Sequence, residues 1–440
     1  ATILLYGGIG VMSRTADVAE YYVAGRRVPA LFNGMATGAD WMSAASFIGM
    51  AGGLYLGGYD GLAFVLGWTG GYVLVALFLA PYLRKFGQFT IPDFLGARYG
   101  GHIPRMIGML CAILCSFTYV VAQIYGVGII TTRFTGVQFE VGVFLGLAGI
   151  LVCSFLGGMR AVTWTQVAQY IILIIAYLIP LAMLGMRHTG IPVPHIAYGY
   201  TLQKLTEREK QLTTDAKELE VRGIYKKRAE DADARVKALP ASYADEKAKV
   251  EKSLADLRAS NADAVKIKAA EDAVKNFPAS PDAAKAKWTA DRNANAARTG
   301  PPRAHATPFP GATDKAREIA RKNFLALIFC LMVGTAALPH ILMRYYTTPS
   351  VKEARTSVTW SLFFIFLLYF SAPVLAVLVK YEIYSVIVGS SFADLPTWVK
   401  SWSAVDRSLL NIVDINGDGI VQLAEIAIGG DIIVLATPEI

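Results

Sequence analysis

Residues that catalyse reactions or bind metals are scarce in this chain. It has four cysteines and five histidines among 440 residues. No nucleophile elbow, phosphate-binding loop or cluster of metal-binding histidines appears in the sequence. The cysteines lie in apolar stretches, where a small buried thiol is the ordinary interpretation. The sequence therefore argues against an enzyme and against a thiolate metal site.

Charge is also missing from most of the chain. Residues 201–322 hold 26 Lys/Arg and 19 Asp/Glu, which is 45 of the chain's 76 charged residues. Basic and acidic residues are interspersed there, so the net charge of +8 does not indicate nucleic-acid binding. The other three quarters predict an all-α polytopic membrane protein with seven complete spans. The apolar runs are 33–53, 62–83, 106–131, a shorter one at 141–159, 161–186, 324–343 and 357–379.

Both ends of the sequence resemble interrupted spans. Residues 1–13 read as the second half of a span, and residues 431–440 as the start of another. We therefore expect the chain to be part of a longer protein.

Positive charges favour one alternating set of loops. Short cytoplasmic loops carry the excess of Lys and Arg, so this count orients the spans. The short loops of the other set, 54–61 and 132–140, contain only Arg133. The insert at 188–322 and the loop at 381–430 are then extracytoplasmic. The residues expected in the cytoplasm are Arg14, Arg26, Arg27, Arg84, Lys85, Arg98, Arg105, Arg160, Arg344, Lys352 and Arg355.

The charged insert has the composition of long helices. Residues 201–239 and 244–277 are rich in Ala, Lys, Glu and Leu, and Pro240 marks a turn between them, which predicts an antiparallel helical hairpin. The proline-rich stretch 278–312 reads as an irregular linker with one short helix. A solvated spacer or docking arm is the expected role of the insert. Docking to a small membrane subunit or to a second copy is a hypothesis.

The first complete span carries polar groups at its middle. Asp40, Ser43 and Ser46 lie inside the run 33–53, which is also rich in glycine. A carboxylate at membrane depth normally faces a cavity, a partner or an ion path. Backbone that unwinds at this depth lines a cavity or is buried in protein, and its carbonyls can hold a cation. The alternative is a helix-packing face of small residues.

Six ordered motifs resemble the sodium/solute symporter family, and most closely its acetate-permease-like branch. They are Met42 to Gly49 (MSAASFIG), Gly58 to Gly61 (GYDG), Leu83 to Thr90 (LRKFGQFT), Ala122 to Gly126 (AQIYG), Gly157 to Gln166 (GGMRAVTWTQ) and Leu338 to Arg344 (LPHILMR). They cover both membrane blocks and exclude the insert.

The resemblance implies an inverted five-plus-five repeat behind one extra N-terminal span, incomplete in this chain. Residues 33–187 would form the first repeat, and 323–380 the first two spans of the second. It also implies a sodium site, with the Ala39 and Met42 carbonyls as donors here. Gln166 stands where many members have an acid, which puts a second cation site in doubt. Asp40 is one place earlier than an Asp of some relatives, and we hypothesise that it tunes cation coupling.

Candidates for binding an organic solute face the middle of the membrane between broken helices. They are Ser43, Ser46, Tyr119, Gln123 and a break at Gly334 and Thr335. The two serines could instead bond only to their own backbone, and Tyr119 and Gln123, four apart on a helix, could only pack. Arg344 and Arg84, at span ends, are interpreted as topology anchors rather than carboxylate clamps.

Residues 414–425 fit the twelve-residue calcium-loop pattern. The ligands would be Asp414, Asn416, Asp418, the Ile420 carbonyl and Glu425. Helices at 402–413 and from 423 onward would flank the loop. A structural calcium ion is the prediction, and a helix-capping turn rich in Asp and Gly is the alternative.

Together these features predict a secondary transporter. The expected function is symport of a small organic solute across the bacterial inner (plasma) membrane by alternating access, with sodium as the coupling ion and a proton as the alternative. A short monocarboxylate such as acetate or pyruvate is expected from the family branch alone. The alternative is a membrane sensor that uses a symporter-like domain.

Overall fold

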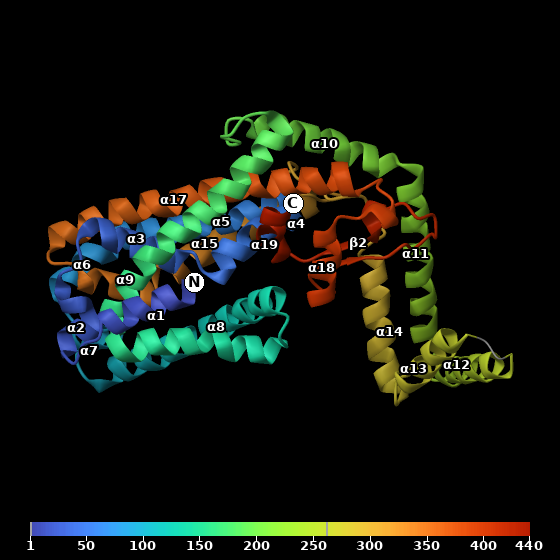
Figure 1. Ribbon diagram of the computed structural model, residues 1–440, viewed down its shortest axis with the longest axis horizontal. Helices are drawn as coiled ribbons and strands as arrows, with labels where there is room; N and C mark the ends of the chain where they lie inside the picture. The colour runs from blue at the N-terminus through green and yellow to red at the C-terminus, as the bar shows by residue number, and fades with distance from the viewer. Residues whose placement is uncertain (1, 261–262) are drawn as a thin grey trace.

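The computed structural model describes residues 2–260 and 263–440, and shows a bundle of long helices from which a helical arm projects (Figure 1). Residue 1 of the predicted partial span and residues 261–262 of the insert lie outside the described part. The first membrane block contains α1 (Thr2–Met12), α2 (Val18–Val23), η1 (Ala24–Arg26), α3 (Ala30–Trp41), η2 (Ala44–Ile48), α4 (Gly49–Gly57), η3 (Gly58–Gly61), α5 (Leu62–Leu74), η4 (Val75–Leu79), α6 (Ala80–Phe86), α7 (Ile91–Tyr99), α8 (His102–Thr135) and α9 (Phe139–Thr189). The second contains α15 (Asp314–Ala336), α16 (Pro339–Leu342), η5 (Met343–Thr347), α17 (Val351–Glu382) and η6 (Ile383–Ile387).

Five helices in the described part are long and apolar enough to cross a membrane. They are Ala44–Phe86, His102–Thr135, Ser154–Thr189, Asp314–Ala336 and Val351–Ile387. The chain is thus a multi-pass membrane protein, but the expected seven spans do not all appear as single long helices. The run 33–53 is interrupted after Trp41, and 141–159 is the first part of α9, which bends at Gly158 with φ of 50°.

Helix α17 lies along α3 at the core of the bundle (Figure 1). Glycines allow the two backbones to approach closely. A Cβ at Gly34 would come within 2.5 Å of the Trp360 Cβ, and one at Gly38 within 3.1 Å of the Phe364 Cβ. The small residues of the first span therefore do serve in packing, as the alternative interpretation held, on the face that meets α17.

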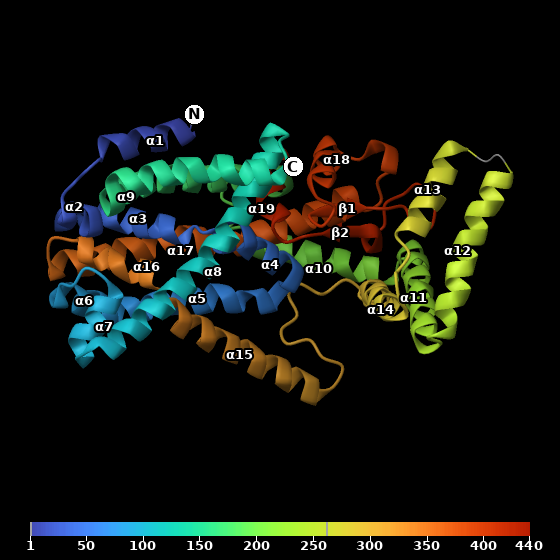
Figure 2. The same cartoon turned by 90° about the horizontal axis from the view of Figure 1, so that it is seen from below.

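The insert contacts the bundle through its first helix, which packs against α17. Its helices are α10 (Tyr198–Thr214), α11 (Ala216–Lys237), α12 (Ala241–Ala259), α13 (Ala264–Lys275) and α14 (Pro281–Ala296), which we call the arm. The predicted hairpin partner was wrong: α11 packs along α14, while α12 pairs with α13 (Figure 2). The helix predicted at 201–239 is divided at Asp215. The backbone of this residue is extended, and its carboxylate caps the N-terminus of α11.

The sidedness expected from the loops fits the arrangement of the elements. Helices α2, α6 and α7 lie at one end of the bundle, and the arm extends from the opposite end (Figure 1). Which end faces the cytoplasm stays a prediction.

The loop that follows α17 and η6 differs from the expectation. It holds η7 (Phe392–Asp394), α18 (Thr397–Val405), β1 (Leu410–Ile412), η8 (Leu423–Glu425), β2 (Ile426–Ile428), α19 (Ile432–Ala436) and η9 (Thr437–Glu439). Of the helix expected at 402–413, only residues 402–405 are helical, as the end of α18, and the segment from 423 forms η8 and β2 before α19. Strands β1 and β2 pair antiparallel instead, with Leu410 opposite Ile428. The β-branched residues of these short segments favour strand pairing.

Candidate functional site

The first span is interrupted in the middle of the bundle, as its polar residues predicted. Helix α3 ends at Trp41, Met42 has φ −79° and ψ 52°, and Ser43 is extended. The helix resumes at Ala44, where Ser43 and Ser46 cap it reciprocally: each hydroxyl accepts the other's backbone N–H, at 3.3 and 3.2 Å. The Ser46 hydroxyl also donates to the Trp41 carbonyl. The serines therefore bridge the break as well as facing the cavity described below.

A second interruption lies in the sixth predicted span, but not at Gly334 and Thr335. Both of these residues remain in α15, and the break comes at Leu338, with φ −64° and ψ 116°. Pro339 explains the position, because the residue before a proline is pushed out of the helical region. Thr335 is buried, whereas Gly334 is exposed.

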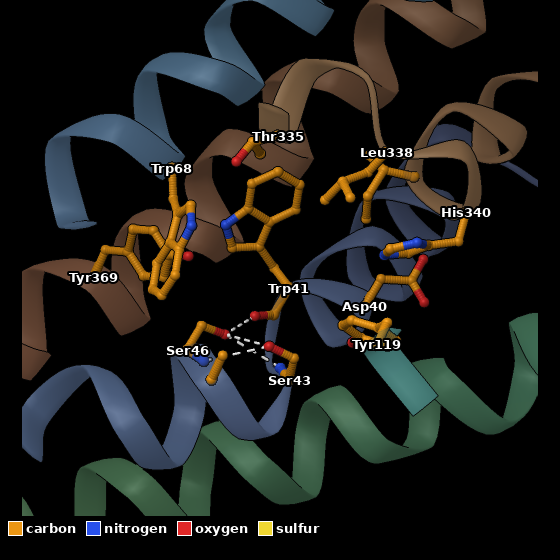
Figure 3. Close-up of a pocket in the computed structure, with 12 residues that line it drawn as sticks. Asp40, Trp41, Ser43, Ser46, Trp68, Tyr119, Thr335, Leu338, His340 and Tyr369 are labelled. Atoms are coloured by element: carbon orange, nitrogen blue, oxygen red, sulfur yellow. Dashed lines mark hydrogen bonds between the residues drawn. The ribbon is translucent and has the colours of Figure 1, made fainter. Parts of the chain in front are cut away.

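A cavity of about 180 Å³ lies between the two interruptions (Figure 3). Pockets for drug-sized ligands measure about 300–1,000 Å³, so this volume suits a smaller solute. Its lining residues are Asp40, Trp41, Ser43, Ala45, Ser46, Trp68, Tyr119, Thr335, Leu338, His340, Ile341 and Tyr369. Four of the predicted solute-binding residues are among them: Ser43, Ser46, Tyr119 and Thr335.

Gln123 lies beside the cavity rather than in its lining. Its Oε1 accepts the backbone N–H of Ala44 at 3.0 Å and so caps the resumed helix. Its Nε2 is buried and has no hydrogen-bond partner among the described residues. The side chain thus supports the break itself, which is closer to the packing interpretation than to direct contact with a solute.

Asp40 forms a buried ion pair with Arg344. The Arg344 Nε donates to Asp40 Oδ2 at 2.5 Å, and its Nη2 to Oδ1 at 3.1 Å. Only 2% of the Arg344 side chain and 9% of the Asp40 side chain are exposed. The interpretation of Arg344 as a topology anchor was therefore wrong, because the break before Pro339 turns this residue back into the bundle. Arg84 lies in the last turn of α6, where its Nε donates to the Thr348 carbonyl at 2.6 Å. Its role as a topology anchor stays a prediction.

Two further side chains complete this polar network. Gln166 donates its Nε2–H to Asp40 Oδ1, and Arg344 Nη1 donates to the Thr163 hydroxyl at 2.9 Å. An acid in place of Gln166 would face Asp40 directly, and like charges at this distance repel. The glutamine that departs from the common family pattern is thus the residue that fits beside Asp40.

The residues expected to hold sodium lie at the first interruption. The Ala39 carbonyl accepts the N–H of Met42 at 3.0 Å. Asp40 already has a guanidinium partner, so its direct contact with a cation would require that pair to separate. The sodium site at Ala39 and Met42 stays a prediction, and Asp40 fits a role in neutralising Arg344.

Several lining residues were missed at the level of sequence. The His340 ring packs against Tyr119, with ring centroids 4.8 Å apart, and Trp68 and Tyr369 form the opposite wall (Figure 3). The helix break that Pro339 imposes could have indicated His340. Nothing local to Trp68 or Tyr369 distinguishes them from other aromatic residues of the spans.

The predicted calcium loop has a tight, internally bonded conformation. Asp414 accepts the N–H groups of Gly417 and Gly419 at 2.7 and 3.0 Å, and both glycines have φ above +70°. Glu425 is fully buried and accepts the N–H of Ile415 at 2.6 Å. No group of three or more acidic, histidine or cysteine side chains in the described part stands close enough to hold a metal. Calcium binding at this loop stays a prediction.

Known proteins resemble this chain over its whole length or parts of it. Residues 21–221 match the model of the sodium:solute symporter family. An uncharacterized symporter of Cupriavidus necator is 55% identical over 445 residues, covering 100% of this chain and 65% of that protein. A monocarboxylic acid transporter of Corynebacterium glutamicum is 25% identical over 365 residues, covering 82% of this chain and 50% of that protein.

Two more similarities are weaker. An uncharacterized symporter of Bacillus subtilis is 33% identical over 168 residues, which is 38% of this chain and 32% of that protein. A solved structure of a Na⁺-coupled sialic acid symporter in a substrate-bound, outward-open state is 15% identical with a TM-score of 0.40, covering 99% of this chain and 78% of that chain. The chain spans about one third to two thirds of the length of the three curated relatives.

Proposed function

We propose that the chain, whose residues 21–221 match the model of the sodium:solute symporter family, forms the substrate-binding part of a sodium-coupled symporter for a small organic solute. The solute is a short monocarboxylate such as acetate or pyruvate, and the protein is an inner-membrane transporter that works by alternating access. One observation carries the proposal: a small cavity lies between the interruptions of two membrane helices.

The interruptions supply what a transported anion and cation require. Unwound backbone leaves N–H groups and carbonyls free to bind a ligand, whereas those of a regular membrane helix are already hydrogen-bonded within the helix. Half-helix N-termini favour negative groups of a solute, and freed carbonyls favour a cation. Sodium binding at the carbonyls of Ala39 and Met42 fits this division, since both residues flank the first interruption.

The cavity walls are consistent with a small anion. Trp68, Tyr369 and Leu338 provide apolar surface, while Ser43, Thr335 and His340 provide groups that can donate hydrogen bonds. Pairing with Arg344 removes the net charge of Asp40, which would otherwise repel a carboxylate. The similarity to the monocarboxylic acid transporter of C. glutamicum supports the same solute class.

Uptake measurements test the proposal. The protein is reconstituted into proteoliposomes, and uptake of labelled acetate, pyruvate, lactate, propionate and proline is compared with and without an inward sodium gradient. We expect sodium-dependent uptake of at least one monocarboxylate and none of proline. Absence of gradient-driven monocarboxylate uptake would refute the proposal.

A pair of isosteric variants links transport to the cavity. Thr335→Val removes a hydroxyl from the lining, and Thr356→Val removes an exposed hydroxyl on α17. Loss of a hydrogen bond to a charged group costs about 1.5–3 kcal/mol, so we expect the KM of the Thr335 variant to rise roughly tenfold or more. The Thr356 variant should transport like the wild type. Equal KM values for both variants would remove Thr335 from the binding site.

A further inference from the structure

The arm is joined to the bundle by a buried ion pair. Lys380, near the end of α17, lies 3.2 Å from the Glu209 carboxylate of α10. Both residues are at most 3% exposed. Burying two charges is unfavourable unless each is paired and hydrogen-bonded. A contact of this kind is not expected of a spacer that floats in solvent.

A short segment of the linker completes this contact. Residues 303–305, here called the strap, pass between α10 and the outer end of α4. The backbone N–H of His305 donates to both Glu209 oxygens at 3.1 Å, and the Arg303 carbonyl accepts from Lys380 Nζ at 3.2 Å. Glu209 therefore holds the strap and Lys380 together.

The strap in turn holds the end of α4. The His305 carbonyl accepts the backbone N–H of Tyr59 at 2.9 Å, and Arg303 forms an ion pair with Asp60. Gly58 permits this closeness: its φ is +56°, and a Cβ there would lie 2.7 Å from the His305 oxygen. The segment immediately after α4 is thus bonded to the strap at two adjacent positions, Tyr59 and Asp60.

The fastened helix is the second half of the interrupted span. Ser43 and Ser46, at the cavity, lead through η2 directly into α4, so a shift of α4 against α17 changes the cavity wall. The arm is braced independently elsewhere, because Arg208 donates to the Tyr384 carbonyl at 2.9 Å and Glu218 accepts the N–H of Ala424 at 3.2 Å. The strap therefore connects α4 to an arm that other contacts already hold against the rest of the protein.

We propose that Glu209 and Lys380 are positioning residues, through which the arm and its strap hold the outer half of the interrupted helix in place against α17. The role in transport rests on the proposed function, and the mechanical role does not. Since neither residue lines the cavity, the pair should affect the rate of the transport cycle rather than solute affinity.

Hydrogen exchange tests the mechanical role without reference to transport. In purified protein, Glu209→Gln leaves Lys380 buried without a counter-charge, and we expect faster amide exchange at 57–61 and 303–307. Glu251→Gln, an exposed acid on α12, is the matched control and should leave both segments unchanged. Equal exchange in the Glu209 variant and the wild type would overturn the proposal.

A double variant separates a specific pair from general damage. Glu209→Gln with Lys380→Met removes both charges, so no unpaired charge remains buried. We expect the increase in amide exchange at 303–307 to be smaller in the double variant than the two single-variant increases added together. Strict additivity would show that the two residues act separately and would contradict the proposal.

Uptake then tests the consequence for transport. We expect Glu209→Gln to lower the maximal rate about fivefold or more, the lower end of typical coupling between sites, with KM changed less than about twofold. An unchanged or increased maximal rate alongside faster exchange would overturn the positioning role. If the wild type transports none of the tested solutes, the proposed function fails, while the exchange result still decides whether the strap holds α4.

Discussion

The carboxylate of Asp40 and the guanidinium of Arg344 meet in a two-point ion pair inside the bundle, although 304 positions separate them in the sequence. The pair connects the first interrupted helix to the segment that follows the second. A solute entering the cavity therefore meets a wall in which the charges are already balanced. This relationship leads to the first two predictions.

Breaking the pair should destabilise the protein strongly. Arg344→Gln leaves a buried carboxylate without its cation, and removal of one partner from a buried pair costs about 3–5 kcal/mol. We expect a clear fall in the melting temperature in detergent. Arg355→Gln, an exposed arginine on α17, is the control and should melt like the wild type. The double variant Asp40→Asn with Arg344→Gln should lose less stability than Arg344→Gln alone, and an equal or larger loss would argue against a specific pair.

Asp40 should also influence cation coupling. Asp40→Asn keeps the size of the side chain but leaves the Arg344 charge unbalanced beside the expected sodium site. Because a nearby positive charge repels sodium, we expect a weaker sodium dependence of uptake, seen as a higher sodium concentration for half-maximal rate. Uptake by this variant with unchanged sodium and proton dependence would refute a role of Asp40 in coupling.

The loop at 414–425 should bind calcium and be stabilised by it. A ligand at 100 times its Kd stabilises the folded state by about 2.7 kcal/mol, so added calcium should raise the melting temperature. Burial raises the pKa of Glu425, and calcium requires the deprotonated carboxylate. Affinity measured by titration calorimetry should therefore fall as the pH is lowered.

Glu425→Gln provides the control for this loop. It should abolish both the binding and its pH dependence. A wild-type protein that shows neither bound calcium nor a thermal shift would leave the loop as a turn built on Asp414 and its glycines.

Acidic pH should loosen the strap through His305. Burial, helped by the positive charge of Lys380, lowers the pKa of His305 to about 3. The His305 ring takes up a proton near pH 6.5 when the strap is undocked, but not when the strap is docked. Docking therefore weakens as the pH falls below 6.5. Each pH unit below 6.5 corresponds to about 1.4 kcal/mol, so we expect the free energy of docking to weaken by about that amount near pH 5.5. The charged groups around it are Glu209, Lys380 and the Arg303–Asp60 pair.

Hydrogen exchange at 303–307, corrected for intrinsic rates, should increase from pH 7.0 to 5.5. His305→Gln removes the titrating group and should flatten this change, and a variant with the same pH response as the wild type would exclude His305 as its source.

Local chemistry accounts for the parts of the fold and site that the sequence predicts. Apolar runs gave the membrane helices, and the glycines and polar residues around Asp40, Ser43 and Ser46 indicated an interruption that the structure contains. Pro339 carried enough information to locate the second interruption, since it restricts the residue before it, yet the expected break was placed at Gly334 and Thr335. Regular composition also predicted helices in the insert, although not their pairing.

The sequence by itself determined the long apolar helices and the place where the first span unwinds, because hydropathy and backbone propensity act over a few residues. Only the tertiary structure decided that Arg344 neutralises Asp40, that Gln123 caps Ala44, and that Glu209 ties the arm to Lys380. These contacts join residues that are distant along the chain. Their choice depends on how helices pack and on the need of each buried charge for a partner, which no short stretch of sequence specifies.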